Sequence, residues 1–269
     1  MSIINSNKSN VSERLLDIGF VFLDEDAVPK ANKSYPVISA YDEKLLWLDV
    51  PSGIYKLLHL DLLGIYADDF HSVNSKENEG LLKIGINTKD PQNLNTPDRQ
   101  IATLTNFSID DGQYAHFPIS KSIFRNVIFK DFIHLKFNSF ELSRNKHDHF
   151  NVLKKVLNGT PEIKNLDILK GLPYLLLVSH FFDSVLNVFG KSQEENNWEE
   201  IPSLAIEPIA GNAFLRSGVY VLYEKTNSQK QAVNLEDMAY QEGRLISTNP
   251  KTILPNHLLL GIGLGKHVQ

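Results

Sequence analysis

His147 and His149 flank Asp148 and form the best candidate for a metal site in the sequence. In an extended His-x-His segment both imidazoles point to the same side, and imidazole nitrogen is a common zinc ligand. A third ligand, from His116 or His134, would have to be supplied by folding. A metal-dependent hydrolase built on His147 and His149 is therefore one alternative, and a solvated junction before a helix is the interpretation we favour.

Two acidic pairs, Asp68-Asp69 and Asp110-Asp111, follow predicted strands. Carboxylates at strand ends hold Ca²⁺ in β-sandwich modules of the C2 type, which this arrangement resembles in architecture and not in sequence. The resemblance implies a peripheral module that binds an anionic membrane surface. Turn chemistry explains both pairs as well, because Asp caps local backbone amides and Asp111-Gly112 is a hairpin signal.

Residues 121–155 are locally basic, with eight basic and three acidic side chains, which gives +5 within a chain of net charge -5. Phenylalanines interleave these charges, and such a pattern can bind single-stranded nucleic acid. The same phenylalanines match core-facing strand positions, so nucleic acid is not the expected partner. Six of the basic residues are candidate contacts for a protein partner: Lys121, Arg125, Lys130, Lys136, Arg144 and Lys146.

Residues 191–207 carry the opposite charge, with five glutamates against one lysine, and include Trp198. Complementary patches on one chain can meet between neighbouring copies, and a tryptophan is a frequent anchor of such contacts. We therefore expect a protein partner or self-association, with Trp198 as the anchor.

Composition excludes several classes of chemistry. The chain of 269 residues has no cysteine, which removes disulfides, thiolate metal sites and cysteine nucleophiles. We find no nucleophile-base pair and no cofactor motif, so a non-catalytic protein without a cofactor is expected. The amino terminus, MSIINSNKSN, lacks the features of a signal peptide, and His180, Asp183 and Asn187 interrupt the most apolar stretch. No transmembrane helix and a cytoplasmic location are expected.

Short alternating or apolar runs, separated by Asn, Asp, Pro and Gly, predict strands through most of the chain. Residues 16–22 alternate at period two, and the turn Pro51-Ser52-Gly53 predicts a hairpin of residues 46–50 and 54–66. The continuous apolar run in residues 257–264 predicts a central final strand. The other predicted strands are 81–86, 101–109, 114–119, 123–129, 132–142, 204–209 and 219–224.

The hydrophobic period changes to that of a helix from Asp148 onward, which predicts a helical section at about residues 148–190, and 235–241 predict a further short helix. The chain is therefore expected to be α+β, mainly an antiparallel β-sandwich with a helical insertion. Residues 1–13 form a leader and 14–269 a single domain, or the chain splits near residues 143–148 into two domains. A protein-interaction module or assembly component is the favoured function.

Overall fold

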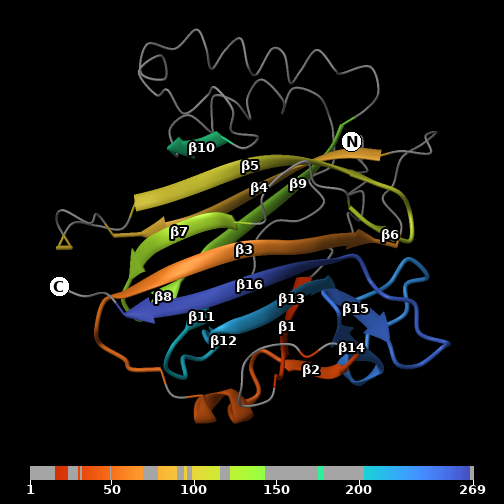
Figure 1. Cartoon of the computed structure of the whole chain (residues 1–269), viewed down its shortest axis with the longest axis horizontal. Helices are drawn as coiled ribbons and strands as arrows, with labels where there is room; N and C mark the ends of the chain where they lie inside the picture. Colours follow the sequence, from red (N-terminus) through yellow and green to blue (C-terminus); the bar gives the residue numbers. More distant parts are fainter. Residues whose placement is uncertain are drawn as a thin grey trace, which may run out of the picture.

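The computed structural model describes residues 16–23, 30, 32–48, 50–68, 78–89, 94–95, 99–115, 122–142, 175–178 and 203–266. Antiparallel strands dominate these ranges, as the sequence predicts (Figure 1). Within them there is no α-helix, and the helical elements are two short 3₁₀ segments, η1 (Glu43–Trp47) and η4 (Leu235–Asp237). The described structure is therefore mostly β, and the α+β expectation is wrong for these ranges.

The largest sheet contains nine strands and curls into a half-barrel. Its path runs in the order β15 (Arg244–Ser247), β14 (Met238–Gln241), β2 (Tyr35–Ser39), β1 (Leu16–Val21), β13 (Gly218–Glu224), β16 (His257–Lys266), β3 (Lys56–Ala67) and β6 (Gln113–Tyr114). The ninth strand, β7 (Ser122–Phe129), also pairs with β3.

The final strand is central, as the apolar run predicts, because β16 pairs with β13 on one side and β3 on the other. Both of its faces are covered: Leu258 and Leu260 belong to one buried cluster, and Leu259 belongs to another. A strand buried on both faces cannot alternate polar and apolar residues, which explains the continuous apolar run.

The two ends of this curled path meet through a side chain. The phenol oxygen of Tyr114, in β6, accepts a hydrogen bond from the Leu245 amide of β15 at 2.6 Å. It also lies 2.9 Å from Nε2 of the fully buried His257, whose Nδ1 lies 2.8 Å from the Pro255 carbonyl oxygen. Because a carbonyl only accepts, Nδ1 carries the proton, and Tyr114 donates to Nε2. We call this contact, from Leu245 through Tyr114 to His257, the seam.

A second, four-stranded sheet has the order β10 (Leu175–Val178), β5 (Arg99–Ile109), β4 (Asn78–Thr88) and β9 (Leu135–Leu142). Strand β10 pairs antiparallel with β5, so the predicted helix across residues 172–189 is wrong at Leu175–Val178. A short apolar run has the same composition in a buried strand and in a buried helix, and hydrophobic periodicity cannot separate them. The rest of the predicted helical section lies outside the described residues.

Buried side chains of the two large sheets share one core. Leu58 and Leu60 of β3 belong to the same cluster as Leu82 and Ile84 of β4 and Phe137 of β9, and all five are completely buried. In β3 the intervening His59 and Asp61 are partly exposed, as its alternating sequence predicts. This burial, at about 25 cal/mol per Å² of apolar surface, is the main stabilising contribution to the fold.

A small third sheet, β12 (Ala213–Phe214), β11 (Leu204–Ala205) and β8 (Phe132–Ile133), lies beside the core, and β11 and β12 pair in parallel. Two local predictions near it fail. Residues 46–50 do not form the first arm of a hairpin, since η1 ends at Trp47, although Gly53 does adopt the positive φ of +73° that its turn requires. The predicted helix at residues 235–241 is η4 followed by β14.

The strands from β13 onward complete the sheet that begins at Leu16, because β13 and β16 lie between β1 and β3. The division of the chain into domains and a leader stays a prediction.

Candidate functional site

The exposed large hydrophobic side chains of the described ranges lie on segments that hydrogen bonds join to one another. They are Tyr41, Leu46, Trp47, Leu48, Ile54, Phe132 and Ile209, and we call them the apolar end. Trp47 is 84% exposed, far more than the 36–49% of the other six. Single exposed apolar residues are common on proteins, whereas a gathered set is typical of a binding surface.

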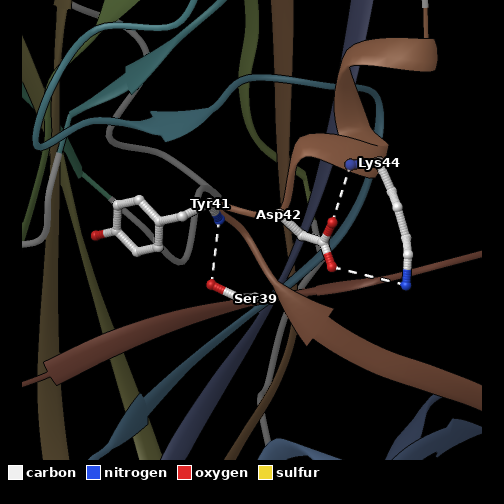
Figure 2. A network of polar contacts seen from close by, with 4 residues as sticks. All are labelled: Ser39, Tyr41, Asp42 and Lys44. Atoms are coloured by element: carbon white, nitrogen blue, oxygen red, sulfur yellow. Dashed lines mark hydrogen bonds and ion pairs between the residues drawn. The ribbon is translucent and has the colours of Figure 1, made fainter.

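The helix η1 carries the most exposed part of this surface. Asp42 caps it, since its Oδ1 accepts a hydrogen bond from the Lys44 amide at 2.9 Å, and Oδ2 lies 3.9 Å from Lys44 Nζ. Figure 2 shows these contacts together with the Tyr41 amide bonded to Ser39 Oγ at 3.2 Å, and the Tyr41 ring points away from Asp42 and Lys44. Leu45 is fully buried and is the only member of η1 in the core.

A buried arginine connects η1 to the segment that carries Ile209. Arg216, 3% exposed, donates from Nε to the Leu45 carbonyl at 2.6 Å and from Nη1 to the Ile206 carbonyl at 3.0 Å. The amide of Phe214 donates to the Ala40 carbonyl at 2.8 Å, directly before Tyr41. These bonds hold two segments far apart in sequence at fixed positions, which lowers the entropy cost of presenting their exposed side chains to a partner.

The loop that carries Ile54 is connected to the turn before Phe132 in the same way. Asp131 accepts from the Gly53 amide through Oδ1, and its backbone carbonyl accepts from the Ile206 amide, both at 2.9 Å. Lys56 donates to the Ile54 carbonyl at 3.1 Å, and burial lowers the pKa of its amine while the Asp131 carboxylate opposes that shift. The apolar end is thus built by three segments joined through polar contacts beneath it.

The charged groups around the apolar end have both signs. Glu43, Lys44, Lys130 and Glu207 are exposed, and Asp42 is partly exposed. An apolar centre with a charged rim is the common anatomy of a protein-protein contact. The arrangement can bind another surface.

One pair of side chains has the residue types of a nucleophile and a base. The Ser203 hydroxyl is hydrogen-bonded to Nδ1 of His134, across the pairing of β11 with β8, and the Phe132 ring lies 5.0 Å from the imidazole. Hydrolysis by a serine also needs a group that orients the imidazole and donors for the oxyanion. The contacts of the described ranges supply neither to this pair. Sequence reasoning missed the pair because the two residues are 69 positions apart.

Three of the predicted basic contact residues, Arg125, Lys130 and Lys136, lie within the described ranges. Arg125 is paired with Asp61 across β7 and β3, with Nη2 3.0 Å from Oδ1. Lys130 is exposed in a turn beside the apolar end, and Lys136 is partly buried in β9. Of the interleaved phenylalanines, Phe124, Phe129 and Phe137 are buried, as the core interpretation predicts, whereas Phe132 is 43% exposed and departs from it. Lys121, Arg144, Lys146 and the predicted anchor Trp198 lie outside the described residues.

The predicted metal ligands His147 and His149 also lie outside the described residues. Among the residues that are described, no group of three or more His, Asp or Glu side chains could hold a metal ion. Asp68 accepts a hydrogen bond from the Ser228 hydroxyl through Oδ2. Asp110 begins a turn in which Gly112 has a φ of +72°, but the strands on either side of it, β5 and β6, belong to different sheets, so the turn is formed and the predicted hairpin is not.

Trp47 is the residue that sequence reasoning should have found and did not. The hairpin prediction places it in a strand, where alternate residues would be buried. The available signal was the sequence Asp42-Glu43-Lys44, because an acidic cap followed by charged residues favours the start of a helical turn over a strand.

No helix in the described part of the chain is both long and apolar enough to cross a membrane. Comparisons of the chain with protein-family models, with curated proteins and with solved structures return no significant match.

Proposed function

We propose that this chain is a non-catalytic component of a protein assembly and that it docks on a partner protein through the apolar end. The observation that carries the proposal is Trp47, which is 84% exposed at the tip of a segment fixed from below by Arg216. A tryptophan held in water by a fixed backbone supports a contact that forms after folding, because the fold gains almost nothing from its side chain.

The energy available from this contact is large enough to support specific binding. Transferring about 200 Å² of tryptophan surface onto a partner, at about 25 cal/mol per Å², corresponds to roughly 5 kcal/mol before the entropy cost of association. Tryptophans in this position are frequent hot spots, whose truncation costs more than 2 kcal/mol of binding free energy.

A membrane surface is the weaker alternative for the apolar end. Binding to anionic lipid is driven by clusters of lysine and arginine next to the inserted apolar residues. Here Asp42, Glu43 and Glu207 outnumber Lys44 and Lys130, which opposes approach to an anionic surface.

Site-specific photocrosslinking tests the proposal. A benzophenone amino acid replaces Trp47 in one variant and the exposed Lys251, between β15 and β16, in a control, and both are irradiated in the cells of origin. We expect a discrete protein adduct from position 47 only. The crosslinked protein is then purified, and calorimetry should show at least tenfold weaker binding by Trp47→Ala than by Lys251→Ala. Equal adducts at both positions, or equal affinities of the two variants, would refute the proposal.

A further inference from the structure

We infer that the partner which covers the apolar end is a second copy of this chain, docked so that both copies use the same surface. This inference rests on the proposed function and specifies its partner. Two observations support it: the exposed apolar area and the mixture of charges around it.

The exposed area has the size of a standard interface. The seven side chains of the apolar end are on average about half exposed; the three aromatic ones offer roughly 150–250 Å² each and the four leucine and isoleucine side chains somewhat less, so together they expose on the order of 600 Å². Stable protein contacts bury about 800 Å² on each partner, and exposed apolar patches of monomers are typically 300–600 Å². Two such ends, with their polar rims, would bury the area that a specific dimer needs.

The charges of the rim are self-complementary. In a two-fold symmetric contact, residue i of one copy meets residue j of the other, and j meets i in return. A surface of one sign would then repel itself, whereas this rim carries Glu43 and Glu207 together with Lys44 and Lys130. Lys44 is 62% exposed and only 3.9 Å from Asp42, a distance typical of a weak surface pair, so its ammonium can turn to an acidic group of the second copy.

The side chains that would bind the second copy, both apolar and charged, are not the ones that stabilise the fold. Leu45 and Arg216 fix η1 from the buried side, while Trp47 and Lys44 face solvent. Variants at the two exposed positions should therefore keep the thermal midpoint of the original chain, so that loss of association can be separated from loss of folding.

Sedimentation velocity on the full chain, from about 1 to about 100 μM, tests the inference. We expect a reversible monomer-dimer equilibrium that Trp47→Ala or Ile209→Ser weakens at least tenfold and that Lys251→Ala leaves unchanged. Lys44→Glu should weaken the dimer several-fold at low salt, and a mixture of Lys44→Glu with Glu43→Lys chains should recover it as a heterodimer.

Each of three results would overturn the inference. The first is a chain that stays monomeric over the whole concentration range. The second is a dimer of unchanged affinity in both Trp47→Ala and Ile209→Ser. The third is Trp47-dependent sedimentation with vesicles of phosphatidylcholine and phosphatidylserine in place of dimerisation. If the chain is monomeric but position 47 crosslinks to a different protein, the inference fails and the proposed function stands, whereas failure of both experiments removes both.

Discussion

Acidification should destabilise this protein through a single buried imidazole. His257 is fully buried, and desolvation lowers its pKa from 6.5 to about 4, although the Pro255 carbonyl acts in the opposite direction. In the unfolded chain the imidazole titrates near 6.5, so between that pH and about 4 the unfolded state binds a proton that the folded state does not. The free energy of unfolding is therefore highest above pH 6.5 and decreases as the pH falls toward 4.

The seam explains why protonation is unfavourable. Nε2 of His257 accepts the Tyr114 hydroxyl proton at 2.9 Å, and a protonated Nε2 could no longer accept it. Tyr114 in turn accepts from the Leu245 amide, Tyr66 stacks on the imidazole at 4.9 Å, and Arg244 lies over the Tyr114 ring at 5.5 Å. Neither Tyr66 nor Arg244 supplies an anion that would stabilise an imidazolium, and the nearby guanidinium opposes it.

The magnitude follows from the two pKa values. When the pH is lowered from about 7.5 to about 4.5, the free energy of unfolding decreases over the interval of about two pH units below 6.5. At about 1.4 kcal/mol per pH unit, the decrease amounts to roughly 3 kcal/mol. Urea unfolding followed by circular dichroism at these two pH values measures the change. His257→Gln is the matched control, because its amide can accept from Tyr114 and donate to Pro255 without titrating in this range.

Between the two pH values, we expect the free energy of unfolding to decrease by about 3 kcal/mol more in the original chain than in His257→Gln. Because the other histidines are present in both proteins, their contribution cancels in this difference. NMR of the His257 ring should show a neutral imidazole protonated on Nδ1 down to about pH 5. Equal losses of stability in the two proteins would show that the seam does not hold His257 in its neutral form.

Three further predictions test the scaffold. Tyr114→Phe removes the hydroxyl of the seam and should lower the free energy of unfolding by about 1–3 kcal/mol, measured by urea unfolding; an unchanged midpoint would contradict the closure of the half-barrel by this side chain. Gly218→Ala should cost about 1–3 kcal/mol, because its φ is +154° and a Cβ there would lie 2.6 Å from Phe20 Cζ, whereas Gly261→Ala, with no contact below 3.5 Å, should cost much less. Arg216→Met removes the guanidinium that donates to the buried carbonyls of Leu45, Ile206 and Leu215, and it should lower the thermal midpoint by several degrees; an unchanged midpoint in scanning calorimetry would refute this expectation.

The sequence predicts the fold correctly where the spacing of hydrophobic residues along a strand indicates that the segment is extended. Ile18 and Phe20 of the first strand are buried, as its alternation predicts, but Val21 is buried as well, in the second cluster, so both faces of this strand are covered. The final strand is a nearly continuous apolar run because Leu258 and Leu259 face different clusters. The prediction fails at Leu175–Val178 because a run of apolar residues has no period that distinguishes a strand from a helix.

The seam has no local signature, and the local signal at the apolar end, Asp42-Glu43-Lys44, indicates a helical turn but not which of its side chains are exposed. Tyr114 and His257 are 143 positions apart, and each looks like an ordinary strand residue until folding brings them together. Trp47 follows two leucines, of which Leu45 is buried and Leu46 is 39% exposed, a pattern set by the direction from which Arg216 anchors η1. A single sequence does not show which distant residue a side chain contacts, or which face of a short segment packs against the core.

In the apolar end, the residues that fix the backbone are different from the residues whose side chains are exposed to solvent. Arg216 satisfies the carbonyls beneath η1, and Leu45 fills the core, so the backbone is fixed before any partner arrives. Because Trp47 is almost fully in water, its removal should leave the free energy of unfolding nearly unchanged while it removes the largest apolar group available for binding. The proposed docking requires such a surface, in which the side chains offered to a partner are not those that hold the fold.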